Sequence, residues 1–301
     1  MGKPWTVLLA TDGSPQAEVA TRLVRALRLP SGAVIEIMRA DEPFASDAEL
    51  PPAAYDALHA AIREEIDTEV ASAKSVVSGA GREVRTVIPF ERAATAIVGE
   101  AKRIAADLVV VGSRGRGQIA TMVLGSVAAE VIDHAPCPVL VARSAKLDRL
   151  ILADDGSYEA MTARDLMGTW PVFAGLDARV VSVARIPEAL GLGPMRHEDA
   201  SQAYAEAIDA LRVMSQTLSS RDAALLTERG LRARAEVRCG DPAQEIVGAA
   251  LEDEADLIVL GSHGRTGLER LLIGSVARTV VTHAPCSVLV VRRMTELCVT
   301  V

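Results

Sequence analysis

The sequence predicts an α/β protein with two tandem, doubly wound domains, each built on a mostly parallel five-stranded sheet with helices on both faces. The first observation is an internal repeat: VVVGSRGRGQIATMVLGSVAAEVIDHAPCPVLVAR, ending at Arg143, returns about 149 residues later as IVLGSHGRTGLERLLIGSVARTVVTHAPCSVLVVR, ending at Arg292. Roughly half of the aligned positions are identical. The second is that aliphatic, strand-like runs alternate with helical segments in both halves. The third is a hydrophobic content of 50% with only 3% aromatics, which predicts a core of Val, Leu, Ile and Ala.

The length of 301 residues accommodates two domains of about 150 residues, each large enough for its own core. We place the first domain at residues 1–145 and the second at residues 146–301. A short linker at about 144–148 joins them.

The first half contains five expected strands separated by helices. The run from Thr6 to Ser14 reads as a buried strand entering a turn, and the following helix takes Ser14 as N-cap and Pro15 as first residue. An acidic, proline-containing loop at 41–52 precedes a helix at 53–78. The other expected elements are strands beginning at Ala33 and Glu83, a helix at 93–106, a strand ending at Gly112, a further helix, and the strand CPVLVAR.

The second half repeats this order. A strand begins at Arg149, and Asp241 and Pro242 look like the N-cap and first residue of a helix, with Gln244 completing a capping box. The other expected elements are a strand from Ala178, a long helix from about His197, the strands LRARAEVRCG and ADLIVLG, a helix, and the strand CSVLVVRR. The first half lacks this cap, because Glu91, Arg92 and Ala93 align with Gly240, Asp241 and Pro242.

Composition argues against several classes of partner. A net charge of -8 and a pI near 5.3 disfavour nucleic acid, which normally needs a basic face and stacking aromatics. No apolar stretch reaches the roughly 20 residues of a membrane span, and the N-terminus lacks the layout of a signal peptide, so we expect a cytoplasmic protein. The four cysteines show no metal-ligand spacing, and we expect structural roles for them.

Two motifs per repeat fall at the carboxyl ends of strands, where open α/β sheets bind ligands. One is a glycine skeleton, Gly112-x2-Gly115-x9-Gly125-Ser126, repeated as Gly261-x2-Gly264-x9-Gly274-Ser275. Such glycines allow positive φ and close backbone approach, while Gly-Ser opening a helix presents free N–H groups to an anion. Simple tight turns would also explain these glycines, but the repeated spacing favours phosphate binding.

Polar residues within the glycine loops could also contact the phosphates. Arg114, Arg116 and Arg265 could neutralise phosphate charge, although loop arginines are often simply solvated. His263 stands where the first repeat has Arg114, and we expect it to contact phosphate and not to act as a general base.

The other motif is the DGS turn after the first strand of each repeat. Asp12 and Asp155 could bind ribose hydroxyls or Mg²⁺; the alternative is a cap of an Asx turn. Asp154 replaces Thr11 and could repel phosphate unless a cation bridges it. The two sites therefore need not be equal.

Together these residues resemble the universal stress proteins of the nucleotide-binding branch, arranged as a tandem pair. The resemblance covers nearly the whole chain and implies ATP as the ligand of both repeats. It assigns to the first site Thr11, Asp12, Gly112, Gly115, Gly125, Ser126 and Val127, and to the second site Asp155, Gly261, Gly264, Gly274, Ser275 and Val276.

This family usually places an aliphatic residue near the end of the second strand, against adenine. Arg39 and Arg185 match that position here, and an arginine could either stack on adenine or narrow the pocket. Family members also commonly dimerise through their last strands. The two repeats could therefore form an intrachain pseudo-dimer, which covers strand edges that would otherwise invite aggregation, and the whole chain could form a homodimer.

We expect no enzyme activity beyond slow ATP hydrolysis. The chain lacks a G-x-S-x-G elbow, and His134 and His283 precede Ala-Pro at helix ends, where a capping role fits. The leading hypothesis is an ATP-binding stress or regulatory protein that acts on an unidentified protein partner. The alternatives are a slow Mg²⁺-dependent hydrolase or phosphotransferase, and a protein-interaction scaffold whose pockets Arg39 and Arg185 close.

Overall fold

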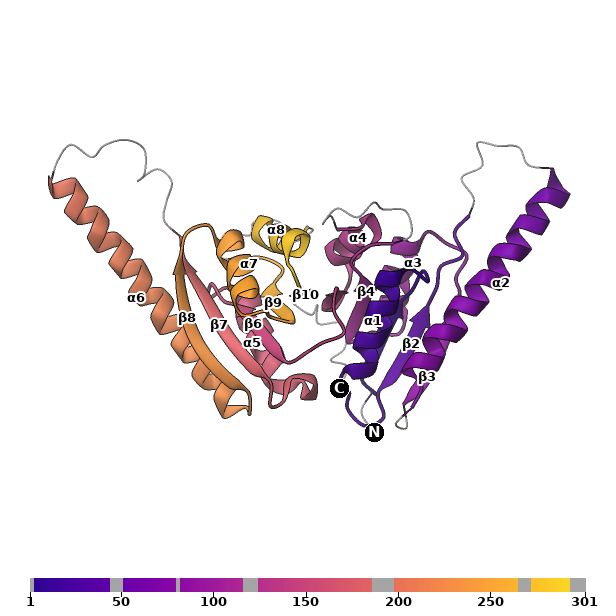
Figure 1. The fold of residues 1–301 in the computed structure, drawn as a ribbon, viewed down its shortest axis with the longest axis horizontal. Helices are drawn as coiled ribbons and strands as arrows, with labels where there is room; N and C mark the ends of the chain where they lie inside the picture. The colour runs from indigo at the N-terminus through magenta and orange to yellow at the C-terminus, as the bar shows by residue number, and fades with distance from the viewer. Residues whose placement is uncertain are drawn as a thin grey trace. The chain divides into compact units, whose positions relative to one another are not determined.

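A computed structural model describes residues 3–43, 51–79, 82–115, 124–185, 198–264 and 272–292. The described chain divides into two compact units that lie within Met1–Lys146 and Leu147–Arg292. The boundary proposed at residues 145 and 146 lies one residue before this division. Each unit is an alternating series of strands and helices (Figure 1).

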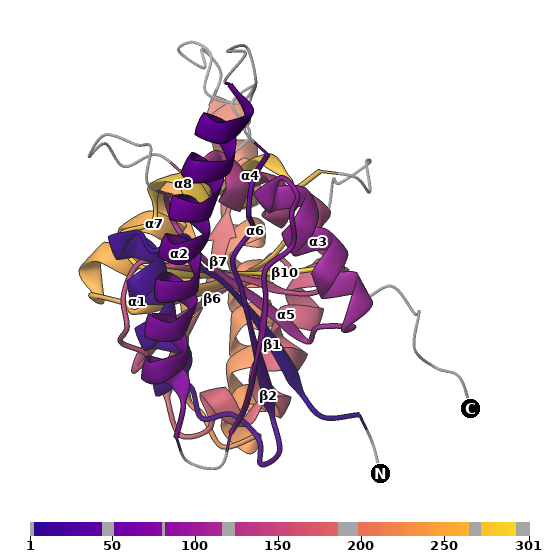
Figure 2. The same cartoon turned by 90° about the vertical axis from the view of Figure 1, so that its right-hand side faces the viewer.

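The first unit has five parallel strands in the order β3-β2-β1-β4-β5. Helices α1 and α2 pack on one face, and α3 and α4 pack on the other (Figure 2). This is the doubly wound arrangement that the sequence predicts. Its elements are β1 (Thr6–Ala10), α1 (Pro15–Ala26), β2 (Val34–Met38), α2 (Pro52–Val77), β3 (Glu83–Val87), α3 (Ala93–Arg103), β4 (Leu108–Gly112), α4 (Ser126–His134) and β5 (Val139–Ala142).

The second unit repeats the topology, with parallel strands in the order β8-β7-β6-β9-β10. Helices α5 and α6 share one face, and α7 and α8 the other. A short 3-10 helix at Pro171–Phe173 was not predicted. The elements are β6 (Arg149–Ala153), α5 (Tyr158–Thr169), β7 (Asp177–Ala184), α6 (Glu198–Glu228), β8 (Arg232–Cys239), α7 (Pro242–Glu252), β9 (Leu257–Gly261), α8 (Ser275–His283) and β10 (Ser287–Val291).

The predicted helix starts are present. Ser14 Oγ accepts a hydrogen bond from Ala17 N at 3.2 Å, and Pro15 is the first residue of α1. Asp241 Oδ1 accepts from Gln244 N at 3.0 Å at the start of α7. These side-chain oxygens satisfy N–H groups that the first helical turn leaves without a partner.

The cores are aliphatic, as the composition predicts. The central strands β1, β4 and β9 are buried except for a half-buried last residue, and the three middle residues of β6 are buried as well. Cys137 and Cys286 are 3% exposed and pack as small apolar side chains. None of the helices in the described part of the chain combines the length and apolar composition needed to cross a membrane.

Candidate functional site

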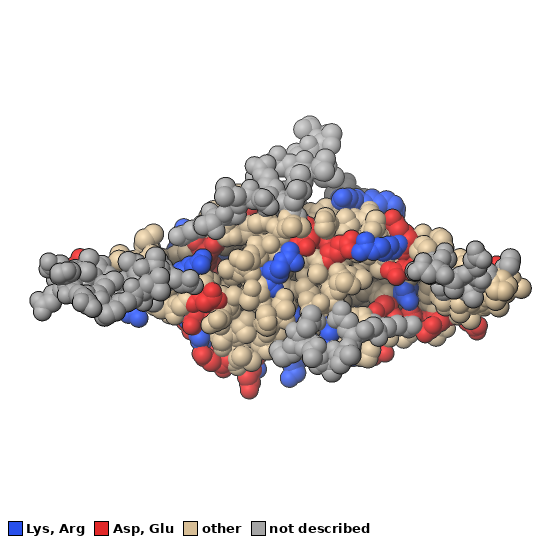
Figure 3. Space-filling view, turned by 90° about the horizontal axis from the view of Figure 1, so that it is seen from above, with Lys and Arg blue, Asp and Glu red and all other residues tan. Residues whose placement is uncertain are grey.

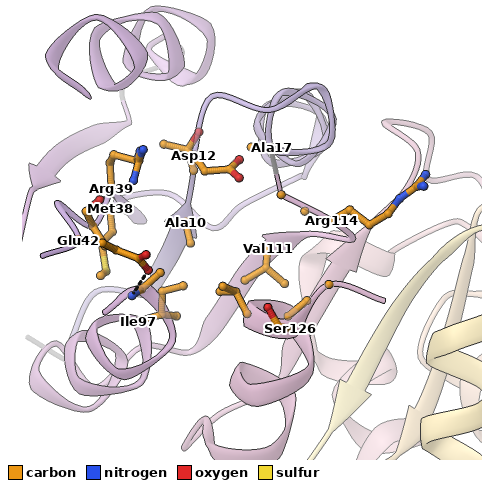
Figure 4. Close-up of a pocket in the computed structure, with 18 residues that line it drawn as sticks. Ala10, Asp12, Ala17, Met38, Arg39, Glu42, Ile97, Val111, Arg114 and Ser126 are labelled. Carbon is orange, nitrogen blue, oxygen red and sulfur yellow. Dashed lines mark hydrogen bonds between the residues drawn. The ribbon is translucent and has the colours of Figure 1, made fainter. Parts of the chain in front are cut away.

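A cavity of about 470 Å³ opens at the carboxyl ends of β1, β2 and β4 in the first unit (Figure 4). Predicted site residues that line it are Thr11, Asp12, Arg39, Gly112, Arg114, Gly115, Gly125, Ser126 and Val127. Sequence reasoning missed the other lining residues, which are Ala10, Ala17, Met38, Ala40, Glu42, Ala93, Ile97, Val111 and Ala128. Parallel strands thus bring together two motifs that lie about 100 residues apart in the sequence.

The DGS turn forms one wall of this cavity. Gly13 has a φ of 69°, a left-handed conformation that favours glycine. Thr11 Oγ1 accepts a hydrogen bond from Gly13 N at 3.3 Å, and Asp12 Oδ1 accepts from Ser14 N at 3.1 Å. Asp12 therefore uses one of its two carboxylate oxygens to form an Asx turn, as the alternative to ligand binding proposed.

The other oxygen of Asp12 faces the glycine loop. A Cβ at Gly115 would lie 2.7 Å from Asp12 Oδ2, and a Cβ at Gly264 would lie 2.7 Å from Asp155 Oδ2. Any residue with a side chain would have to displace the carboxylate. The same close approach in both units explains why glycine occupies this position in each copy.

The first glycine of each skeleton has a packing role. A Cβ at Gly112 would lie 2.9 Å from the carbonyl carbon of Gln16, and one at Gly261 would lie 2.6 Å from Glu159 Cβ. These glycines let β4 and β9 approach the first turns of α1 and α5. Positive φ occurs in the DGS turns but not in the two glycine skeletons. Of the two properties considered for these glycines, positive φ and close backbone approach, the skeletons therefore use only close approach. At Gly112 and Gly261 that approach is to the neighbouring helix.

Helix α4 begins at the opposite wall with an uncapped N-terminus. Its N-cap, Gly125, has no side chain to offer, while Gly125 N donates to Ser113 O at 2.9 Å and fixes the loop. Gly274 bonds to Ser262 O at 2.8 Å in the same way before α8, which begins with Ser275 and Val276. The first N–H groups of α4 and the positive end of its dipole therefore lie beside the cavity.

The second unit differs from the first at Asp154, which stands in place of Thr11. Asp154 Oδ1 accepts from Gly156 N at 2.9 Å, and Asp155 Oδ1 accepts from Ser157 N at 2.9 Å. Asp154 is only 3% exposed. This burial, together with the neighbouring carboxylate of Asp222, raises its pKa to about 6.

Two arginines compensate the Asp222 carboxylate, which is fully buried on α6. Arg164 Nη1 lies 3.1 Å and Arg221 Nε 2.6 Å from Asp222 Oδ1. The additional negative charge of the second repeat thus lies in a network with two cations. Repulsion of phosphate by Asp154 is correspondingly weaker than the sequence suggests.

The correspondence drawn between Arg39 and Arg185 is wrong. Ala10 pairs with Met38 in the first unit and Ala153 pairs with Val181 in the second, so the residue that matches Arg39 is the buried Ser182. Arg185 is exposed and stands three residues further on, at the position of Glu42. The strand register is the same in both units, and the offset of 143 residues that relates Asp12 to Asp155 also relates Arg39 to Ser182. The comparison of the two second strands was displaced by three residues.

Glu42 supplies the cap that the local sequence of α3 lacks. Arg92, the N-cap residue, makes no side-chain capping bond, whereas Glu42 Oε1 accepts from Ala93 N at 2.7 Å (Figure 4). The missing Asp at the start of α3 and the acidic loop after the second strand were the available signals. Neither identifies Glu42 without the fold.

Three histidines singled out in the sequence each contact a residue close by in the chain. His134 Nδ1 lies 2.9 Å from Glu130 O and His283 Nδ1 lies 2.9 Å from Thr279 O, each inside its own helix. His263 Nδ1 lies 3.1 Å from Ser262 Oγ. Arg116 and Arg265 lie outside the described residues.

Charged groups are mixed over the face seen in Figure 3, where described Lys and Arg side chains alternate with Asp and Glu. Within the described ranges, no group of three or more His, Cys, Asp or Glu side chains is arranged to hold a metal ion.

Comparison with known proteins shows similarity along the whole chain. The model of the universal stress protein family matches residues 6–143 and 147–292. A universal stress protein of Mycolicibacterium smegmatis is 26% identical over 302 residues, covering 95% of this chain and 96% of the relative. Universal stress protein Rv2005c of Mycobacterium tuberculosis is 30% identical over 201 residues, covering 62% of each chain. A Methanocaldococcus jannaschii relative is 52% identical over 66 residues, 39% of its length.

A solved structure has the same fold over nearly its full length. The universal stress protein from Archaeoglobus fulgidus DSM 4304 matches with a TM-score of 0.65 at 20% identity, covering 96% of this chain and 98% of that one. With both repeats matched by the family model, the chain belongs to the universal stress protein family, as a tandem pair of its domains.

Proposed function

We propose that the chain is an ATP-binding regulatory protein in which each repeat holds one nucleotide between its DGS turn and its glycine loop. The observation that carries this proposal is the convergence of Asp12, Gly115 and the N-terminus of α4 on one cavity. In both units the aspartate carboxylate lies so near the loop glycine that an added Cβ would be 2.7 Å from its Oδ2, which supports a second site of the same kind.

The first cavity offers a suitable group for each part of a nucleotide. The N–H groups at Ser126 and Val127 suit the phosphates. Arg114 lines the same end of the cavity, with its guanidinium directed away from the other lining residues in Figure 4. Asp12 Oδ2 suits a ribose hydroxyl, and the buried side chains of Met38 and Ile97 suit a base. Its volume of about 470 Å³ lies in the usual range of ligand pockets, about 300–1,000 Å³.

In the second unit the corresponding groups are Asp155, Gly264, His263 and the N-terminus of α8. Mg²⁺ would accompany the triphosphate and reduce its charge. The proposed regulation works through unequal affinity: ATP shifts the protein toward the conformation that binds it better, and an unidentified protein partner senses the shift. Association of the two repeats within the chain, and of two chains, belongs to the same proposal.

The test is to denature freshly purified protein and identify the released small molecules by mass spectrometry. ATP is the expected result. Released ADP or AMP would favour the slow hydrolase or phosphotransferase. A protein that releases nothing and binds no nucleotide on titration would be an interaction scaffold, contrary to the proposal.

A double variant locates the site. Replacing Gly125 and Gly274 by Val places side chains at the two uncapped helix starts, where a Cβ would lie 3.2 Å from Arg114 Cα and 3.3 Å from Ser262 O, respectively. We expect binding to be lost. Undiminished affinity in a folded double variant would contradict the phosphate-loop assignment.

A further inference from the structure

We infer that Arg39 and Glu42 recognise the edge of the base in the first pocket, that Glu69 positions Arg39, and that this pocket selects a 6-aminopurine over a 6-oxopurine. The inference rests on the proposed nucleotide site. It adds three residues that determine which base the site accepts, and it predicts that the two repeats differ in this preference.

The first pocket has two chemically distinct ends. Arg114 and Ser126 lie at one end, whereas Met38, Arg39, Glu42 and Ile97 gather at the other (Figure 4). If the phosphates take the end with the free helix N–H groups, the base is directed to the end that combines apolar side chains with one cation and one carboxylate.

Arg39 is held in place before any ligand arrives. Its Nε donates to Glu69 Oε2 at 2.8 Å, and its Nη1 donates to the carbonyl oxygen of Ala40. The Arg39 and Glu69 side chains are 17% and 9% exposed, so the pair is largely shielded from water. Arg39 Nη2 donates to no described residue and remains available as a fixed donor at the pocket.

Glu42 is fixed by a different contact. Oε1 accepts from Ala93 N at 2.7 Å at the start of α3, an interaction that the positive end of the helix dipole strengthens. The other carboxylate oxygen accepts no hydrogen bond from the described residues. Glu42 therefore supplies a charged acceptor at the same end of the pocket as the Arg39 donor.

This pair complements the edge of adenine. The 6-amino group can donate to the Glu42 carboxylate, while the adjacent ring nitrogen N1 can accept from Arg39. Hypoxanthine reverses the pattern at two atoms, because its O6 is an acceptor facing a carboxylate and its N1 carries a hydrogen facing a donor. Arg39 is largely shielded from water, and a bound base would cover Glu42, which is exposed without ligand. Mismatched polar groups at this end of the pocket are therefore costly.

The second repeat does not reproduce the pair. The strand pairing shows that Ser182 occupies the position in the second repeat that Arg39 has in the first, and that Arg185 occupies the position of Glu42. A neutral hydroxyl thus replaces the fixed cation, and a cation replaces the carboxylate. We expect no preference for a 6-amino group there.

The test compares ATP with inosine triphosphate, which differ at the purine edge, by calorimetric titration of the full chain carrying Gly264→Val to silence the second site. We expect ATP to bind more tightly by on the order of tenfold. In Glu42→Gln this ratio should fall toward one, because an amide can donate to O6 as readily as it accepts from an amine.

Glu69→Gln tests positioning. It should also reduce the ratio, while affinity for inorganic tripolyphosphate, which has no base, stays constant. A merely structural role for Glu69 would weaken both ligands equally. Arg39→Lys, which keeps the charge but not the planar guanidinium, should behave like Glu69→Gln.

The outcomes separate this inference from the proposed function. If no nucleotide binds to wild type or to the Gly264→Val chain, the nucleotide site itself fails. If ATP binds but the ratio to inosine triphosphate is near one, or is unchanged in Glu42→Gln and Glu69→Gln, the base-reading assignment is overturned and the nucleotide site stands.

Discussion

Replacing Asp154 by Asn should stabilise the protein at neutral pH. Asp154 is 3% exposed and shares its surroundings with Asp222. Its pKa rises from 3.8 to about 6, mainly because burial disfavours the charged form. The folded protein therefore holds more protons than the unfolded chain between these two values, and its stability falls as pH rises through that window.

The size of the Asp154 pKa shift sets the expected gain in stability. A difference of about two pKa units corresponds to roughly 3 kcal/mol of destabilisation above pH 7, which shrinks below about 1 kcal/mol near pH 4. Asn keeps an acceptor for Gly156 N and can donate to Asp222, so it removes the charge while preserving the turn. We expect Asp154→Asn to gain about 1–3 kcal/mol at pH 7.5 and much less at pH 4.5.

Urea unfolding of the ligand-free full chain, followed by circular dichroism at both pH values, measures this difference. Asp155→Asn is the matched control, because it makes the same change one residue along at an exposed carboxylate, and should alter stability by less than about 0.5 kcal/mol. If Asp154→Asn were equally stabilising at both pH values, or destabilising at pH 7.5, the assignment of a buried, proton-linked carboxylate would be refuted.

Three further changes test the packing around the site. Gly112→Val should destabilise the first unit by more than about 2 kcal/mol, since a Cβ there would lie 2.9 Å from the backbone of α1. The control is Gly99→Ala in the middle of α3, where a Cβ would meet nothing within 4 Å, and it should be neutral or stabilise by up to about 1 kcal/mol. Equal denaturation midpoints of these two variants would contradict the packing role of Gly112. Glu42→Ala should lower stability by about 1 kcal/mol through loss of the α3 cap, whereas Glu42→Gln should keep most of it; identical thermal melts of both variants would show that the cap is not needed. Arg164→Met should destabilise the second unit by about 3 kcal/mol or more by leaving Asp222 undercompensated, and an unchanged urea midpoint would count against the ion network.

The repeat and its pattern of strands and helices were sufficient to predict the fold and half of the residues that line the first pocket. Local signals are strong there: Ser14 and Pro15 specify the start of α1, and the aliphatic runs specify buried strands. Strand ends also place Asp12 and Gly115 at the same edge of the sheet, because parallel strands share their carboxyl ends.

What sequence reasoning missed depends on contacts between distant segments. Glu42 caps a helix 51 residues away, and Asp222 reaches Arg164 across 58 residues through the packing of α6 on α5. The match of Arg39 to Arg185 is a different kind of error, because the offset of 143 residues between Asp12 and Asp155 already gives Ser182 as the residue that matches Arg39. The sequence does not show whether a glycine is needed for its backbone conformation or for close packing. At Gly112 and Gly261 the neighbouring helix residues show that it is close packing.

The stoichiometry of ATP binding tests the two-site proposal most directly. Calorimetric titration of the full chain should give two ATP per chain, one after Gly115→Val or Gly264→Val alone, and none after both, with folding of each variant checked by circular dichroism. Two ATP bound by a folded double variant, in which each valine Cβ would lie 2.7 Å from the neighbouring aspartate Oδ2 and displace it, would contradict the assignment of the nucleotide to these loops.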